Sequence, residues 1–361
     1  MFVGVGTGVR LASTHYGKVT LLAKTPTLEG VISKSVNVAI VQKPPVVLDR
    51  DGTIKRTIEY LDEVAAEGAQ LAVFPETFIP GYPFWAWYVH PIDDIHTRNE
   101  IYGRLLENSV DIDGGDLDAI QKTVADHGLV VVIGINERSP DSRTSLYNSL
   151  VTIGSDGSIL NVHRKLVPTY VERNVWAPGD GAGLKVVDTE IGRIGGLICW
   201  ENLMPVARYS LYAQGLDIYV VSTYDNSDVS IATMQHIARE ARSWVVSSGV
   251  ALHKDDIPDD FPAREKIVGQ MDSDWENPGD SVVVSPNGTV IAGPLRDEYG
   301  ILYAEIEPGK SREQGWYMDT AGHYNRPDIF DVKVDRTRRT AIEFIDDEVQ
   351  SDNTETISET G

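Results

Sequence analysis

The chain contains 361 residues, of which 42% are hydrophobic and 24% are charged, a composition typical of a soluble globular protein. Its formal net charge of −22 argues against nucleic acid and anionic membranes as partners, because phosphate groups bind basic residues. No stretch approaches the roughly 20 apolar residues of a membrane span, and the single cysteine, Cys199, excludes an internal disulfide and favours a reducing, cytoplasmic location.

The two ends of the chain differ from its middle. Residues 1–35 carry four Lys and Arg residues against Glu29 alone, with no clear apolar core or cleavage site of a targeting peptide, so we expect a disordered N-terminal extension. Residues 331–361 are expected to form a C-terminal tail that is disordered at its end, because residues 342–361 hold seven acidic residues and no Lys or Arg. One folded domain is therefore expected over residues 36–330.

The first half of this domain alternates between strand and helix patterns. A β-branched, alternating run predicts a strand at 36–42, and Ile54, Ile58 and Leu61 recur at helical spacing in the segment that follows. The expected elements are, in order, strand 36–42, helix 53–69, strand 71–76, helices near 98–109 and 116–127, strand 129–136 and a hairpin over 147–165.

The second half repeats this order. Its expected elements are strand 193–199, helix 203–214, strand 217–222, helix 231–243, strand 244–250, a hairpin over 281–293 and strand 301–307. Strands that alternate with helices and carry added hairpins form mixed sheets covered by helices. We therefore expect an α/β fold, a four-layer α-β-β-α sandwich of two mixed sheets.

Cys199 stands where a buried strand is expected to end and a helix to begin. A lone cysteine is often only a small buried hydrophobic residue. However, ligands bind at the carboxyl ends of strands in α/β sheets, and a following helix would lower the pKa of the thiol. On position alone, catalysis and packing remain equally open.

A thiol nucleophile also needs a base and a group that stabilises the developing anion. His163, His236 and His253 lie in plausible regions, but none belongs to a recognised local signature. Glu76 and Lys165 follow two other apolar strands. Each alone suggests a loop acid or a surface lysine, whereas together with Cys199 they would converge in one crevice.

These residues lie in three longer motifs. Glu76 stands in VFPETFIPGYP, Lys165 in HRKLVPTYVERNVWAPGDG, and Cys199 in GGLICWENLMPVARYSLYAQG. From about Val36 to about Phe330 the chain resembles the nitrilase superfamily of carbon–nitrogen hydrolases. The resemblance implies a nitrilase-like fold and a Glu–Lys–Cys triad, with Glu172 as a second glutamate near the lysine.

The motifs CWENLMP, QHIAREAR and NPGDSVVVSPNG resemble the nitrilase branch more than the amidase or carbamoylase branches. The resemblance implies hydrolysis of a small-molecule nitrile to the carboxylic acid and ammonia through a thioimidate and a thioester, with no cofactor and no metal. An amidase or carbamoylase, and an enzyme that hydrates cyanide or another nitrile and stops at the amide, remain open. A scaffold without activity is disfavoured by the intact triad, and a redox sensor by the lack of a resolving cysteine.

Aromatic residues gather just after Glu76, in the segment GYPFWAWYVHP. Tyr82, Trp87 and Trp200 are candidates for an apolar substrate pocket, which would favour arylaliphatic or medium aliphatic nitriles. A core cluster or a subunit contact is the alternative for the loop. The resemblance also implies a homo-oligomer built from dimers, through the surface of segment 206–215, with spirals or filaments as larger forms.

Overall fold

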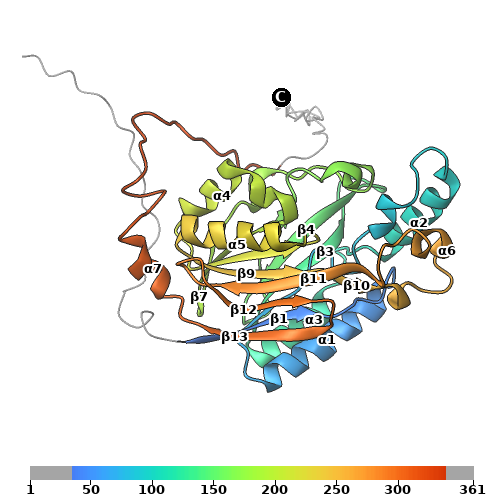
Figure 1. The fold of residues 1–361 in the computed structure, drawn as a ribbon, viewed down its shortest axis with the longest axis horizontal. Coiled ribbons are helices and arrows are strands. Elements are labelled where there is room, and N and C mark those ends of the chain that lie inside the picture. The colour runs from blue at the N-terminus through green and yellow to red at the C-terminus, as the bar shows by residue number, and fades with distance from the viewer. Residues whose placement is uncertain (1–34, 339–361) are drawn as a thin grey trace, which may run out of the picture.

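The computed structural model describes residues 35–338, so the expected N-terminal extension and acidic end lie outside the described residues. Two sheets pack face to face and helices cover their outer faces (Figure 1). Among the described residues, no helix is both long and apolar enough to cross a membrane. The fold is the expected α/β sandwich.

The first sheet has six strands, and three of them, β1, β2 and β3, run parallel to one another. Its order is β13 (Gly300–Ile306), β1 (Val36–Gln42), β2 (Leu71–Val73), β3 (Val130–Arg138), β4 (Leu146–Ile153) and β5 (Ile159–Arg164). The other pairings are antiparallel. β13, the last strand of the described residues, is an edge strand of this sheet and pairs with β1, the first strand.

The second sheet has seven strands around the parallel set β7, β8 and β9. Its order is β10 (Ala251–His253), β11 (Trp275–Val284), β9 (Trp244–Gly249), β8 (Ile218–Thr223), β7 (Gly192–Ile198) and β6 (Val187–Thr189), with β12 (Val290–Arg296) paired to β11. Both sheets are mixed, as the strand and hairpin pattern predicts. The short strands β6 and β10 were not expected.

Alternating residues of each strand face two different layers. In β1, Val38 and Ile40 pack between the sheets against β7 and β8, whereas Ala39 and Val41 pack beneath helices. Helices α1 (Arg50–Ala66) and α3 (Asp118–His127) cover the first sheet, and α4 (Pro205–Tyr212) and α5 (Asp228–Ala241) cover the second. Each fully buried aliphatic side chain contributes about 1.5–3 kcal/mol.

The remaining helices lie at the ends of the sandwich. They are α2 (Ile95–Asn108), α6 (Arg264–Val268) and α7 (Lys310–Gly315), with short 3₁₀ turns that include η1 (Phe84–Trp87), η2 (Tyr170–Asn174) and η4 (Cys199–Leu203). Several expected boundaries differ by a few residues, and two of these lie beside the site. The strand at 71–76 ends at Val73, and the helix expected from residue 203 begins only at Pro205, because η4 precedes it.

Candidate active site

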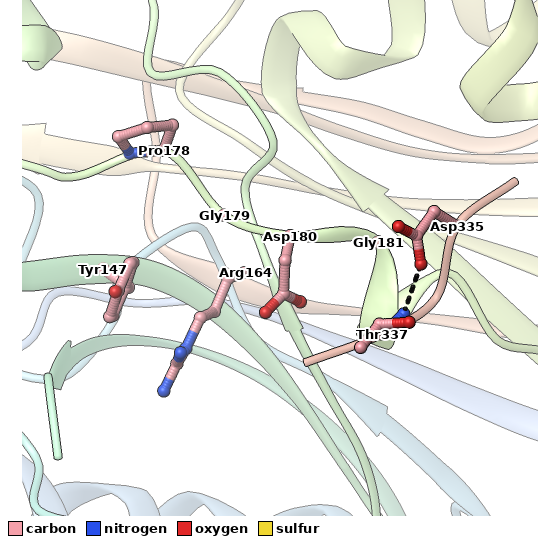
Figure 2. A pocket seen from close by; sticks show the side chains of 8 residues that line it. All are labelled: Tyr147, Arg164, Pro178, Gly179, Asp180, Gly181, Asp335 and Thr337. Carbon is pink, nitrogen blue, oxygen red and sulfur yellow. Dashed lines mark hydrogen bonds between the residues drawn. The ribbon is translucent and has the colours of Figure 1, made fainter. Parts of the chain in front are cut away.

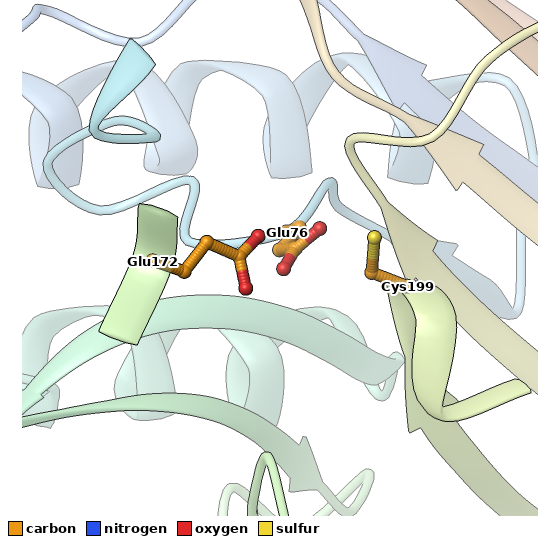
Figure 3. A group of neighbouring side chains, drawn as sticks. All are labelled: Glu76, Glu172 and Cys199. Atoms are coloured by element: carbon orange, nitrogen blue, oxygen red, sulfur yellow. The ribbon is translucent and has the colours of Figure 1, made fainter. Parts of the chain in front are cut away.

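The ends of three strands bring the expected triad together. Glu76 follows β2, Lys165 directly follows β5, and Cys199 directly follows β7. All three are buried, with exposed fractions of 1%, 1% and 7%. A carboxylate oxygen of Glu76, one of Glu172 and the sulfur of Cys199 lie within 4.8 Å of one another, and the three side chains point toward a common centre (Figure 3).

The loop that carries Glu76 crosses β3 at a glycine. A Cβ atom at Gly134 would lie 2.3 Å from the carbonyl oxygen of Pro75 and 2.5 Å from the backbone nitrogen of Thr77. Real Cβ contacts are never this short, so glycine allows the close approach. Gly134 therefore allows the loop that carries Glu76 to pack directly against β3.

Cys199 has a left-handed backbone conformation, with φ of 51°. This conformation costs a residue other than glycine about 1–3 kcal/mol and often occurs at functional sites. Two neighbouring side chains hold the turn: Asn202 Nδ2 donates to the Cys199 carbonyl at 2.8 Å, and Glu201 Oε2 accepts from the Ile198 N–H at 2.9 Å. The thiol is thus fixed at the end of β7.

The ammonium of Lys165 bridges the two glutamates. Its Nζ donates to Glu76 Oε1 at 2.8 Å and to Glu172 Oε2 at 2.7 Å. Glu76 also accepts from Asn148 Nδ2 at 2.7 Å and from the Tyr224 N–H at 2.7 Å. Lys165 therefore places one positive charge between the two carboxyl groups. The expectation of no metal and no cofactor stays a prediction.

Glu172 is fixed from the other side. Its Oε1 accepts a hydrogen bond from the Tyr82 hydroxyl at 2.7 Å, and its Oε2 accepts from the Thr169 N–H at 2.6 Å as well as from Lys165. Glu172 is 2% exposed. Glu172 is therefore held in place beside Lys165 by three hydrogen bonds.

Burial dominates the electrostatics of the site. It raises the pKa of the Cys199 thiol to about 12, with a further increase from Glu76, although Lys165 opposes the shift. Burial also raises the pKa of Glu76, while Lys165 lowers it. For Lys165, burial by itself lowers the pKa, but Glu76, the Cys199 thiolate and Glu172 outweigh it, so the pKa is raised.

The thiol pKa therefore shifts opposite to the expected direction. The expectation relied on the N-terminus of a helix that begins at residue 203, but the 3₁₀ turn η4 occupies Cys199–Leu203 and α4 begins at Pro205. The Cys199 thiol, with its pKa raised to about 12, is therefore protonated near neutral pH and lies beside Glu76. Such a site attacks an electrophile only with a base that takes the thiol proton as the new bond forms.

A model of the carbon-nitrogen hydrolase family matches residues 37–314. The chain belongs to the carbon–nitrogen hydrolase family. It is 36% identical over 305 residues to an aliphatic nitrilase of Sinorhizobium fredii, covering 84% of this chain and 97% of that protein. It is 34% identical over 304 residues to a bifunctional nitrilase/nitrile hydratase of Nicotiana tabacum, covering 83% and 86% of the two chains.

Solved structures of this family share the fold. A carbon–nitrogen hydrolase from Helicobacter pylori has a TM-score of 0.64 at 19% identity, covering 82% of this chain and 97% of that chain. The Nit3 protein of Saccharomyces cerevisiae, a member of the nitrilase superfamily, has a TM-score of 0.61 at 18% identity, covering 82% and 98%. The nitrilase-like α-β-β-α sandwich expected from the sequence is confirmed.

The three aromatic residues expected to line the substrate pocket differ in exposure and in their ring contacts. Tyr82 is buried and stacks on Tyr224 with 3.8 Å between ring centroids. Trp87 is 43% exposed and lies parallel to Tyr224 at 6.4 Å. Trp200 is 49% exposed and makes no ring contact within residues 35–338. Tyr82 and Trp87 thus gather beside the triad, and Trp200 adjoins it only along the chain.

The three histidines considered above lie apart from the reacting groups. His163 is buried against Glu201, His236 is exposed on α5, and His253 packs on Trp275. Sequence reasoning missed Tyr224 and Asn148, which both hold Glu76. Tyr224 directly follows β8, so the strand-end argument used for Cys199 would have identified it, whereas Asn148 lies inside β4 and carries no such signal.

A separate polar cavity of about 380 Å³ lies beyond β5 (Figure 2). Its lining residues are Tyr147, Arg164, Pro178, Gly179, Asp180, Gly181, Asp335 and Thr337. Arg164 is held by Glu137 at 3.0 Å and stacks on Tyr147. Because neighbouring residues of a strand point to opposite faces, this cavity and the side chain of Lys165 lie on different sides of the β5 end.

Proposed function

We propose that the protein is a nitrilase that hydrolyses a small-molecule nitrile to the carboxylic acid and ammonia. Relatives named as nitrilases, at 33–36% identity over most of the chain, support a hydrolase that acts on nitriles. The structural observation that carries the proposal is the Lys165 ammonium, which bonds Glu76 and Glu172 beside the thiol. Cys199 is the nucleophile, Glu76 the base, Lys165 the electrostatic stabiliser and Glu172 the residue that positions Lys165.

The first stage forms a covalent adduct. Glu76 takes the proton of the Cys199 thiol while the sulfur attacks the nitrile carbon, so a C–S bond forms and one π bond of the nitrile breaks. The proton then passes from Glu76 to the nitrogen, and a thioimidate results. Lys165 stabilises the negative charge that develops on the nitrogen, as a fixed donor does in an oxyanion hole.

Two waters complete the reaction. The first gives a proton to Glu76 and adds as hydroxide to the thioimidate carbon, and Glu76 returns that proton to the nitrogen. The hydroxyl proton of the tetrahedral intermediate then passes through Glu76 to the nitrogen as the C–N bond breaks, so ammonia leaves, a thioester remains and Glu76 is again a base. The second, again deprotonated by Glu76, adds to the thioester carbon. The C–S bond then breaks, the carboxylic acid leaves, and Glu76 returns the proton to sulfur. The raised pKa of the thiol suits this cycle because sulfur departs as a group that Glu76 reprotonates.

Nitrile hydration to the amide is the second candidate. One relative is named a bifunctional nitrilase/nitrile hydratase, which favours this outcome as a partial or complete alternative. The two reactions share every step as far as the tetrahedral intermediate and differ only in whether the nitrogen or the sulfur leaves. An amidase or carbamoylase would use the same residues on a different substrate.

Ammonia release and product identity from matched nitriles and amides test these proposals. Acid and ammonia from nitriles, with little turnover of amides, would support the nitrilase. Amide accumulation from nitriles would identify a hydratase, and turnover of amides alone would identify an amidase. Cys199→Ala serves as the control in each assay, and activity that survives in it would contradict the mechanism.

The substrate pocket and the assembly belong to the same proposal. We assign Tyr82 and Trp87 to the pocket on their stacking with Tyr224, and Trp200 on its place next to Cys199. A homo-oligomer through the α4 surface, where Leu203 and Val206 are exposed, would appear as a concentration-dependent mass in light scattering. We also propose a cytoplasmic location, and neither nucleic acid nor membrane as a partner.

A further inference from the structure

Glu276 is a carboxylic acid that the mechanism above does not use. It lies in β11, and its Oε1 accepts a short hydrogen bond from the Tyr224 hydroxyl, with the Tyr88 hydroxyl 3.5 Å away. The other oxygen, Oε2, is buried and has no hydrogen-bond partner in the described part of the chain. A buried carboxyl oxygen without a partner is costly, so its retention needs a reason.

Tyr224 connects Glu276 to the catalytic carboxylate. The Tyr224 N–H donates to Glu76 Oε2 at 2.7 Å, and the Tyr224 carbonyl accepts from Asn277 Nδ2 at 2.6 Å. Glu276 and Asn277 are neighbours in β11, and they hold Tyr224 at its hydroxyl and at its backbone. A change in the hydrogen bond between Glu276 and Tyr224 would therefore alter the position of Tyr224, whose N–H bonds Glu76.

The ring of Tyr224 belongs to a row of four aromatic residues, which we call the aromatic row: Tyr82, Tyr224, Trp87 and Tyr170. Tyr82 is 6% exposed and bonds Glu172, whereas Trp87 is 43% and Tyr170 is 71% exposed. The row therefore leads from the buried triad to the surface. It is the apolar surface that the organic group of a substrate would meet beside Cys199.

We propose that Glu276 is a positioning residue that fixes the Tyr224 ring and so sets the fit of the aromatic row to the organic group of the substrate. The proposal rests on the nitrilase function proposed above. A carboxylate is a stronger acceptor for the Tyr224 hydroxyl than a neutral acid, so ionised Glu276 holds the ring more firmly.

The environment of Glu276 makes this contact sensitive to pH near neutrality. Burial raises the pKa of Glu276 to about 7, and the Tyr224 and Tyr88 hydroxyls oppose the shift. These two hydroxyls are the titratable groups that face it, and no ion pair to Glu276 exists among residues 35–338. From β10, His253 faces Trp275 instead. The ring is therefore held more firmly above pH 7 than below it.

The test measures kcat and KM on both sides of pH 7 for phenylacetonitrile and propionitrile. In the unaltered protein, the KM for phenylacetonitrile is expected to fall as the pH rises through 7, with a smaller change for propionitrile. Glu276→Gln is expected to raise the KM for phenylacetonitrile about fivefold, to change kcat less, and to remove the pH dependence. Tyr224→Phe removes the hydroxyl that donates to Glu276, and it is expected to raise the KM for phenylacetonitrile and to remove the pH dependence in the same way.

Tyr102→Phe is the matched control. Tyr102 lies in α2, and its hydroxyl donates to the Thr144 carbonyl at 2.6 Å and to neither Glu276 nor Glu76. It should keep the profile of the unaltered protein. A Glu276→Gln profile that follows the unaltered protein in both KM and pH dependence would overturn the proposal. If Glu276→Gln does not fold, Tyr224→Phe decides by the same criterion.

Failure of the nitrilase function would be recognised separately. If the unaltered protein turns over neither nitrile, that function fails, and phenylacetamide and propionamide replace the nitriles in the same comparison. Binding of phenylacetonitrile and phenylacetamide to Cys199→Ala, followed by the fluorescence of Trp87 and the other tryptophans, gives a readout without turnover. Equal affinity with and without Glu276→Gln in that background would overturn the positioning role.

Discussion

The imidazole of His163 lies 3.0 Å from the carboxylate of Glu201 in the interior, where the two side chains are 1% and 0% exposed. The same carboxylate accepts the Leu166 N–H at 2.6 Å and the Ile198 N–H at 2.9 Å. Leu166 follows Lys165 and Ile198 precedes Cys199. Glu201 therefore joins the two strand ends that carry the lysine and the thiol.

Removal of this carboxylate is expected to affect both stability and activity. Glu201→Ala leaves the buried Ile198 N–H, the partly buried Leu166 N–H and His163 without their partner, which should cost about 3–5 kcal/mol in the free energy of unfolding. Glu201→Gln keeps one acceptor oxygen and should cost less. Urea unfolding and kcat measured on both variants check this, and equal stability of Glu201→Ala and the unaltered protein would contradict it.

Glu201 also predicts a loss of stability in acid. Burial by itself raises its pKa, but His163 and the two backbone N–H groups hold the pKa of Glu201 below its ordinary value of 4.5. A carboxylate with a lowered pKa stabilises the fold above its unfolded value, and this stability disappears as the pH falls through the folded value. Glu201→Gln should therefore lose less stability than the unaltered protein when the pH is lowered below 4.5, as measured by urea unfolding.

Replacement of Lys165 should make the fold less stable as the pH rises. Burial already raises the pKa of Glu76 and Lys165 opposes that shift, so in Lys165→Met, which leaves Glu76 and Glu172 buried without a cation, the pKa of Glu76 rises further above its unfolded value. A carboxyl with a raised pKa favours the fold while it is protonated, and the fold loses stability as the pH rises. Lys165→Met is expected to abolish turnover and to be most stable in mild acid, whereas stability that increases up to neutral pH would argue against the buried charge triad.

The sequence predicts the position of the triad well for a simple topological reason. Glu76, Lys165 and Cys199 each follow an apolar strand, and a sandwich of two such sheets brings these strand ends to one edge. The hydrogen bonds that hold these three residues in place are harder to predict from the sequence. Glu201 and Tyr224 act across gaps of 35 and 148 residues, on Leu166 and Glu76, and no local pattern encodes such pairings.

Electrostatic detail depends on short stretches of backbone that patterns do not resolve. The expected lowering of the Cys199 pKa required a helix from residue 203. A 3₁₀ turn stands there and α4 begins two residues later, and the deep burial of the thiol raises its pKa instead. Glu276 illustrates the same limit. It lies before the hairpin expected over 281–293, outside any expected element, and only the fold reveals its contact with Tyr224.

Gly134 provides a test of the backbone geometry that positions the base. In Gly134→Ala the new Cβ would lie 2.3 Å from the Pro75 carbonyl oxygen and 2.5 Å from the Thr77 nitrogen. Both are backbone atoms, so the loop that carries Glu76 must move. A displacement of this size at the base should lower kcat on the order of 100-fold. Steady-state kinetics on the purified variant measure this.

Gly103→Ala is the matched control. Gly103 lies in helix α2 with nothing within 4 Å of the added Cβ, so the same substitution should stabilise the protein by about 0.5–1 kcal/mol and leave kcat unchanged. Equal kcat values for Gly134→Ala and Gly103→Ala would mean that the Glu76 loop tolerates displacement. In that case the close approach to β3 would serve packing between the strand and the loop, and the position of the base would depend on its hydrogen bonds to Asn148, Lys165 and Tyr224.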